Sequence, residues 1–145
     1  MKLYELVDKY HRETDLTCAE AMLKACNEYF KLNLSKESMS LLSLMGIGMQ
    51  TELSSCGAFT IAVALIGYFS NPDNVLNVDN ELGEEMVFQL TDKVLEEFGN
   101  LQCRALNQLE IQDYENPCNF IVVKIAQYLE DILNEYIFKS SEISA

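Results

Sequence analysis

The amino-acid sequence predicts an all-α fold, a single-domain helical bundle of about five to seven helices. Apolar residues recur at the three- and four-residue spacing of helices along most of the 145-residue chain, without sustained strand-like alternation. Residues that break helices are scarce, with 2 Pro and 6 Gly. Hydrophobic residues make up 49% of the chain and charged residues 23%, the composition of a globular domain rather than a disordered one.

Two helices are predicted near the beginning of the chain. The first is indicated by apolar residues that share one helical face, namely Leu3, Leu6, Val7 and Tyr10. The second covers residues 17–30. It begins with Thr17 and Glu20 at capping-box spacing, so that each side chain can bond a free backbone amide.

Two more helices are predicted before residue 70. A weaker one covers residues 36–45, and Gly46 and Gly48 are expected to end it. The next covers residues 56–69, with Ser54 and Ser55 as candidate N-caps. Its apolar run is too short to cross about 30 Å of hydrocarbon, so we expect a buried core helix and no membrane span.

The second half of the chain begins with an expected loop over residues 70–79, which is rich in Asn. A helix over 80–98 stops at Gly99, and a short helical turn follows over 101–107. Asn116 and Pro117 are typical of the start of a helix. The last helix has its buried stripe at Ile121, Ile125, Leu129, Ile132 and Tyr136. We expect one domain over residues 1–138 and a frayed tail over 139–145.

The charge balance excludes one class of function. Lys and Arg number 10 against 23 Asp and Glu, which gives a formal net charge of −13. Nucleic acid would be repelled by such a chain, so we expect no nucleic-acid partner. The first residues show no signal-peptide pattern, which favours a cytoplasmic location where thiols stay reduced.

Cysteine is the most informative residue type, since five Cys stand against a single His. Cys18, Cys56 and Cys118 each fall in the first turn of a predicted helix, where the helix dipole favours the thiolate. Cys103 precedes Arg104, a second possible source of thiolate stabilisation. Cys26 lies in the middle of a helix and is interpreted as core.

The cysteine spacing leaves metal binding open as an alternative. No CxxC pair exists, so zinc ribbons, thioredoxin motifs and ferredoxin clusters are not indicated. Separate helices of a bundle can nevertheless bring four thiolates to one zinc ion or iron–sulfur cluster. His11 is interpreted as complementing the dipole at the end of the first helix. A protease-like pair of His11 with a cysteine is the less favoured alternative.

Four segments resemble the C_GCAxxG_C_C family of redox-active proteins: TCAEAML (17–23), GIGMQTELSSCGAF (46–59), FGNLQCRAL (98–106) and NPCNFIVVKIAQYLEDIL (116–133). The resemblance implies a site formed by Cys18, Cys56, Cys103 and Cys118, with Cys26 outside it. Gly57 matches the family motif, whereas Ile61 replaces its final Gly and fills space that a cofactor pocket would need. Gly57 and Arg104 are the candidate cofactor-contacting residues.

These observations lead to a thiol-based redox protein as the main functional hypothesis, and to a thiol/disulfide oxidoreductase as its enzymatic form. Cys56 and Cys118 are the preferred nucleophiles because of the residues that begin their helices. The alternatives are a non-catalytic module that binds zinc or an iron–sulfur cluster through the same four cysteines, and an interaction protein with structural cysteines. The expected partner is a redox protein or a small molecule, and the apolar helix faces leave a homodimer open.

Overall fold

The computed structural model describes residues 1–76 and 79–139, and every regular element in these ranges is helical. The predicted all-α class is therefore confirmed. The helices follow in the order α1 (Leu3–Glu13), α2 (Cys18–Tyr29), α3 (Lys36–Leu41), η1 (Gly48–Glu52), α4 (Gly57–Ser70), α5 (Glu81–Phe98), α6 (Cys103–Asn107), α7 (Pro117–Leu133) and η2 (Asn134–Phe138). Among them is no helix with the length and apolar character needed to cross a membrane.

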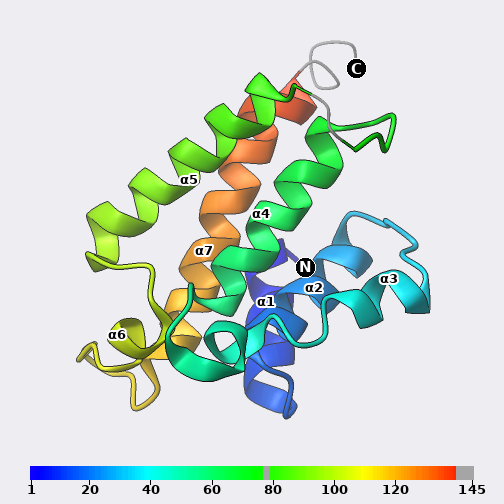
Figure 1. Cartoon of the computed structure of the whole chain (residues 1–145). Coiled ribbons are helices and arrows are strands. Elements are labelled where there is room, and N and C mark those ends of the chain that lie inside the picture. Colours follow the sequence, from blue (N-terminus) through cyan, green and yellow to red (C-terminus); the bar gives the residue numbers. More distant parts are fainter. Residues whose placement is uncertain (77–78, 140–145) are drawn as a thin grey trace.

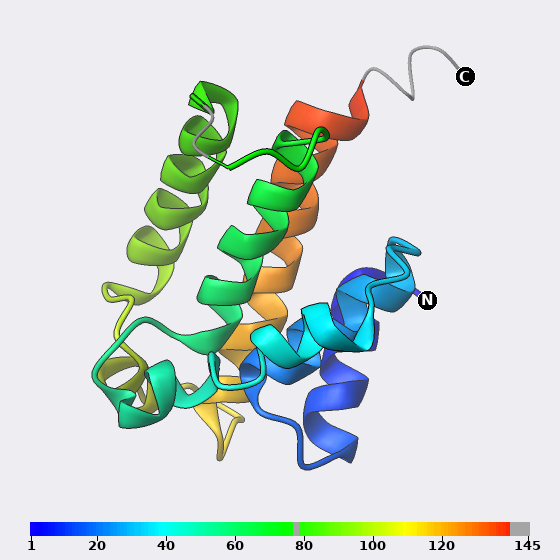
Figure 2. The same ribbon diagram turned by 45° about the vertical axis from the view of Figure 1, so that its right-hand side comes forward.

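Helix α7 is the centre of the arrangement. It packs against α1, α2, α4, α5 and α6. Figures 1 and 2 show α4, α5 and α7 as three long helices that run side by side, with α1 and α2 to one side of them. Helices α4, α6 and α7 all begin at the same end of the molecule, the lower end in both views.

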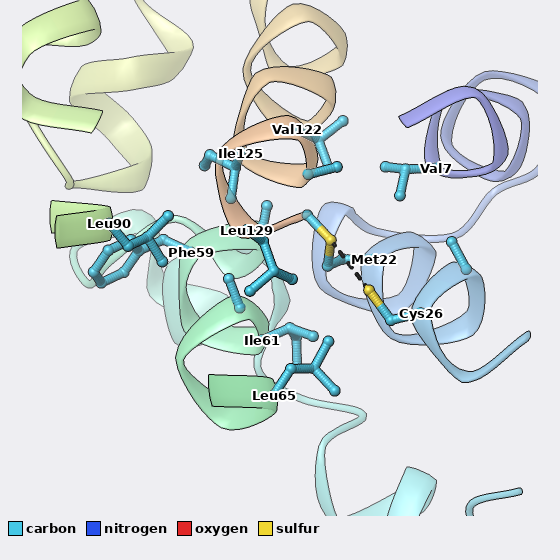
Figure 3. Packing of buried hydrophobic residues seen from close by; sticks show 14 of the residues in the cluster. Val7, Met22, Cys26, Phe59, Ile61, Leu65, Leu90, Val122, Ile125 and Leu129 are labelled. Carbon is cyan, nitrogen blue, oxygen red and sulfur yellow. Dashed lines mark hydrogen bonds between the residues drawn. The ribbon is translucent and has the colours of Figure 1, made fainter. Parts of the chain in front are cut away.

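The hydrophobic core fills the space between α1, α2, α4, α5 and α7. Figure 3 shows Val7 of α1 and Met22 of α2 close to Val122 and Leu129 of α7, with Ile61 of α4 below. These five side chains are fully buried. Burying such side chains is the main source of stability in a bundle of amphipathic helices.

Several helices begin where the sequence predicts. The capping box of α2 is present: the Oγ1 of Thr17 accepts from the Glu20 amide at 3.2 Å, and the Thr17 amide donates to Glu20 at 3.1 Å. The side chain of Asn80 caps α5. At the start of α7 the Oδ1 of Asn116 accepts from the Cys118 amide at 3.0 Å. Each contact satisfies a backbone amide that would otherwise have no partner.

Two predicted boundaries are wrong. Helix α3 ends at Leu41, before Gly46 and Gly48, and none of its residues is fully buried. Helix α4 has Cys56 as its N-cap, without a side-chain cap, so neither Ser54 nor Ser55 caps it. The backbone around these two serines pairs with the segment before α6 instead.

Part of two predicted segments lies outside the described residues. These are residues 77–78 of the loop predicted over 70–79 and residues 140–145 of the tail predicted over 139–145. The loop predicted over 70–79 begins one residue late, because α4 continues through Ser70.

Candidate functional site

All four cysteines that the sequence analysis singled out line one cavity of about 260 Å³. They come from four different helices and are separated by up to a hundred residues of sequence. The remaining lining residues are His11, Thr17, Ile47, Glu52, Gly57, Leu106, Asn107, Asn116 and Ile121. The cavity therefore combines four thiols with one imidazole and a mostly apolar wall.

Each of these cysteines lies at the beginning of its helix. Cys18 is the first residue of α2, Cys103 the first of α6 and Cys118 the second of α7, and Cys56 is the N-cap of α4. The backbone amides of a first helical turn have no partner within the helix and carry a partial positive charge. The bundle thus gathers the four thiols at helix starts, where backbone amides can contribute to stabilising a thiolate, as the sequence predicts for three of the four.

A short antiparallel pairing holds two of the cysteines together. The Cys56 amide donates to the carbonyl of Leu101 at 2.8 Å, and the Cys103 amide donates to the carbonyl of Ser54 at 2.9 Å. These two hydrogen bonds fasten the beginning of α4 to the beginning of α6. The two segments are far apart in the sequence, so no local pattern predicts this contact.

The turn before α4 has several residues with positive φ and packs closely against Cys103. Ile47, Met49 and Gln50 have left-handed φ values of 53°, 60° and 67°. Gly48 lies between them with φ +56°, and a Cβ added there would lie 2.6 Å from the Cβ of Cys103. Left-handed conformations are unfavourable for residues other than Gly, so this turn stores strain beside the cavity.

The two candidate cofactor-contacting residues have different surroundings. Gly57 lines the cavity, and a Cβ added to it would lie 3.0 Å from both the Cβ of Ala19 and the Cα of Gly46. Close packing between α4, α2 and the preceding turn therefore accounts for Gly57. Arg104 is not among the lining residues, and its guanidinium lies 3.6 Å from the carboxylate of Glu52 with both side chains about half exposed.

Cys118 has the most favourable environment for a thiolate. Its pKa is lowered because the thiol of Cys18 donates a hydrogen bond to it, which outweighs the opposing effect of burial. The same interaction raises the pKa of Cys18 well above its usual value, since Cys18 must keep its proton to donate it. In the neutral state the Cys118 thiol also donates to the Oδ1 of Asn107 at 3.1 Å, a contact that ionisation would break. One thiol of this pair is thus prepared to ionise while the other stays protonated.

The remaining two thiols are not activated. Burial raises the pKa of Cys56 to about 11, although the amides of Phe59 and Ala58 stabilise its thiolate. Burial, followed by the charges of Cys118 and Glu52, also raises the pKa of Cys103. The expectation of a low pKa at Cys56 therefore does not agree with its surroundings, because desolvation outweighs the helix amides.

His11 lines the cavity beside a cysteine, a pairing that the sequence analysis gave only as its less favoured alternative. Its Nε2 lies 3.4 Å from the Sγ of Cys18, and its Nδ1 lies 3.1 Å from the Nδ2 of Asn119. The ring lies in the last turn of α1, as expected, but it contacts these two side chains. The available sequence signal was the short connection between α1 and α2, which brings position 11 close to position 18.

Two residues of the motif region belong to the core. Cys26 is completely buried, and its thiol lies 3.8 Å from the Sδ of Met22. A dashed line in Figure 3 marks this contact. Its interpretation as core is confirmed. Ile61 is also completely buried and is not among the cavity-lining residues. The side chain that replaces the motif's final Gly therefore leaves the cavity open.

The four thiols are chemically suited to bind a metal ion, but their positions are not. Four thiols are suitable ligands for zinc or an iron–sulfur cluster. Within residues 1–76 and 79–139, however, no three His, Cys, Asp or Glu side chains are positioned to hold a metal ion. The thiols share a cavity without sharing a coordination centre, so the arrangement does not fit a metal site.

Comparison with known families gives one result. A family model described as "Putative redox-active protein (C_GCAxxG_C_C)" matches residues 16–132. This range includes all four cavity cysteines and excludes His11. The chain matches no curated protein and no solved structure.

Proposed function

The chain belongs to the C_GCAxxG_C_C family, and from this premise we propose that it exchanges thiols and disulfides at the four-cysteine cavity. The observation that carries the proposal is the pair Cys18 and Cys118. Their thiols interact directly at the wall of the cavity, and the interaction lowers the pKa of one and raises that of the other. A nucleophilic thiolate beside a protonated second thiol is the arrangement that thiol–disulfide exchange requires.

Cys118 acts first in this proposal. Its thiolate attacks one sulfur of a disulfide substrate, and the disulfide bond of the substrate breaks. The electron pair of that bond leaves with the other substrate sulfur as a thiolate, which then takes up a proton. Cys118 is now joined to the substrate in a mixed disulfide.

Cys18 acts second. Once the Cys118 sulfur is bonded to substrate it carries no charge, so the main cause of the raised pKa of Cys18 is removed. Cys18 loses its proton and attacks the Cys118 sulfur, which releases the second substrate thiolate. The substrate disulfide has then gained two electrons, and the protein has lost them by forming a Cys18–Cys118 disulfide.

A reduced thiol or dithiol partner restores the protein by the reverse exchange. We propose that the protein works in a reducing compartment such as the cytoplasm, where such reductants are present and free thiols persist. Cys56 and Cys103, which line the same cavity, act as a second pair in this proposal. Their raised pKa values make them slower to react, so we expect them to oxidise after the first pair.

Disulfide mapping tests this function. The reduced protein is titrated with oxidised dithiothreitol at pH 7, quenched with acid, alkylated and analysed by mass spectrometry. We expect the first disulfide to join Cys18 and Cys118. In the Cys18→Ser variant a disulfide probe should remain attached to Cys118, because the thiol that releases it is missing. Cys118→Ser should form neither product.

Cys26→Ala is the matched control, since it removes a buried thiol outside the cavity and should leave both products unchanged. Elemental analysis of anaerobically purified protein completes the test. A first disulfide that excludes Cys118 contradicts the proposal. So does a stoichiometric metal ion that is lost when any of the four cysteines is replaced by Ser, because the cavity would then be a binding site.

A further inference from the structure

The imidazole of His11 connects the cavity to a small polar network inside the protein. Its Nε2 faces Cys18 at 3.4 Å, and its Nδ1 faces the side-chain nitrogen of Asn119 at 3.1 Å. Asn119 is 8% exposed, and it is the one buried polar side chain within the described ranges. A side-chain amide is costly to bury in a bundle core unless its donors and its acceptor form hydrogen bonds.

Asp8 determines how Asn119 is oriented. The Nδ2 of Asn119 donates to the Oδ1 of Asp8 at 3.1 Å. The pKa of Asp8 is lowered by its hydrogen bond with Arg12, so its carboxylate is ionised and can only accept. Turning the amide over would place two acceptor oxygens against each other. The nitrogen of Asn119 therefore faces both Asp8 and His11.

The orientation of Asn119 in turn fixes the proton on His11. A side-chain amide nitrogen is a donor, so the Nδ1 of His11 must accept. Burial lowers the pKa of His11, which favours the neutral ring. A neutral imidazole that accepts at Nδ1 carries its proton on Nε2, the nitrogen that faces the sulfur of Cys18. Such a ring donates to the sulfur and cannot remove a proton from it.

We propose that Asp8 and Asn119 are positioning residues that hold His11 as a hydrogen-bond donor to Cys18, and that this donor makes Cys18 the leaving sulfur when the Cys18–Cys118 disulfide is reduced. The inference rests on the proposed function. An incoming thiolate attacks the Cys118 sulfur, the disulfide breaks, and Cys18 leaves with the electron pair while the Nε2 proton hydrogen-bonds to it. A second thiol then releases Cys118, so two small thiols become one disulfide.

This role differs from that of the histidine in a cysteine protease, which accepts a proton from the thiol. His11, a residue outside the four-cysteine motif, thus determines which of the two sulfurs leaves when the disulfide is reduced. A hydrogen bond to a developing thiolate favours that sulfur as leaving group by about tenfold or more.

The tautomer of His11 can be measured directly, because it is the only His in the chain and its nitrogen signals need no assignment. Long-range nitrogen–proton NMR of the reduced, labelled protein at pH 7 should show a neutral ring protonated at Nε2. Asp8→Asn should release the orientation of Asn119 and produce a mixture of tautomers. Glu13→Gln removes the same charge from an exposed place on the same helix and should leave the spectrum unchanged.

The regiochemistry of reduction gives a second readout. The oxidised protein is treated with 2-mercaptoethanol and quenched, and the adducts on Cys118 and Cys18 are quantified by mass spectrometry. We expect a Cys118 to Cys18 ratio of about ten or more, a loss of most of this preference in His11→Leu, and its partial recovery in His11→Gln, whose amide can still donate. Circular dichroism confirms that the variants are folded.

The outcomes separate this inference from the proposed function. A ring protonated at Nδ1, or an imidazolium at pH 7, overturns the inference even if a variant fails to fold. An unchanged adduct ratio in folded His11→Leu also overturns it, while the function stands. Failure of Cys18 and Cys118 to form a disulfide refutes the proposed function and leaves the NMR result as an independent measurement.

Discussion

The close approach of Gly48 to Cys103 predicts that Gly48→Ala destabilises the protein strongly. Gly48 has φ +56°, and an added Cβ would lie 2.6 Å from the Cβ of Cys103 and 2.8 Å from the carbonyl oxygen of Ser54. Neither neighbour moves easily, because the backbone pairing between the starts of α4 and α6 involves both of their residues. The new methyl group must therefore push the two helix starts apart.

The magnitude follows from two separate costs. Holding a residue other than Gly in the left-handed region costs about 1–2 kcal/mol. Forcing an extra methyl group into a packed site costs a further ~1–3 kcal/mol. We therefore expect Gly48→Ala to lower the free energy of unfolding by about 2–5 kcal/mol. With a urea dependence of about 2 kcal/mol per molar, the midpoint moves down by about 1–2.5 M.

Two other glycines separate these costs in the same urea-unfolding assay. Gly99 has φ +77° with no atom within 4 Å of an added Cβ, so Gly99→Ala should show the conformational cost alone. Gly67 lies inside α4 with open space around it, and Gly67→Ala should stabilise the protein by about 0.5–1 kcal/mol. The reasoning is refuted if Gly48→Ala costs no more than Gly99→Ala.

Three further predictions concern the thiols and the network beside them. Iodoacetamide should modify Cys118 fastest of the cavity thiols. The rate of modification of Cys56, followed by mass spectrometry, should rise about tenfold per pH unit until its pKa of about 11. A rate at Cys56 that does not change with pH would contradict a pKa raised by burial. Because the folded-state pKa of Asp8 is lowered from 3.8, its contribution to stability is complete above that value and is lost as the pH falls through the lower folded value. Asp8→Asn should therefore lose less stability than the wild type between pH 5 and pH 2 in thermal melts. Cys26→Ala should cost about 1 kcal/mol in urea unfolding, the cost of removing one buried heavy atom, without changing the first disulfide.

The sequence predicts those parts of the structure that depend on interactions between residues close together in the chain. Thr17, Asn80 and Asn116 begin their helices with side-chain caps, and Gly99 ends α5 in the left-handed conformation. Each of these signals acts within a few residues, so one sequence is enough to find it. The gathering of four cysteines at helix starts follows from the same signals together with the family resemblance.

What the sequence does not reveal depends on contacts between distant segments. Ser54 and Ser55 have the side chains of N-caps, but their backbone is engaged with the segment before α6, and Cys56 takes the cap position. The left-handed turn at Ile47 and Met49 has no local cause, because neither residue favours that conformation. The role of His11 likewise depends on a partner from α7.

The packing of α1 against α7 also determines when the site can exist during synthesis. His11 is made early, but Asn119, which orients it, follows 108 residues later. Cys118 is made after the other three cavity cysteines and is the one whose pKa is lowered. A nascent chain therefore lacks the contact between Cys18 and Cys118 until its last long helix docks, so the difference in pKa between these two thiols arises only on folding.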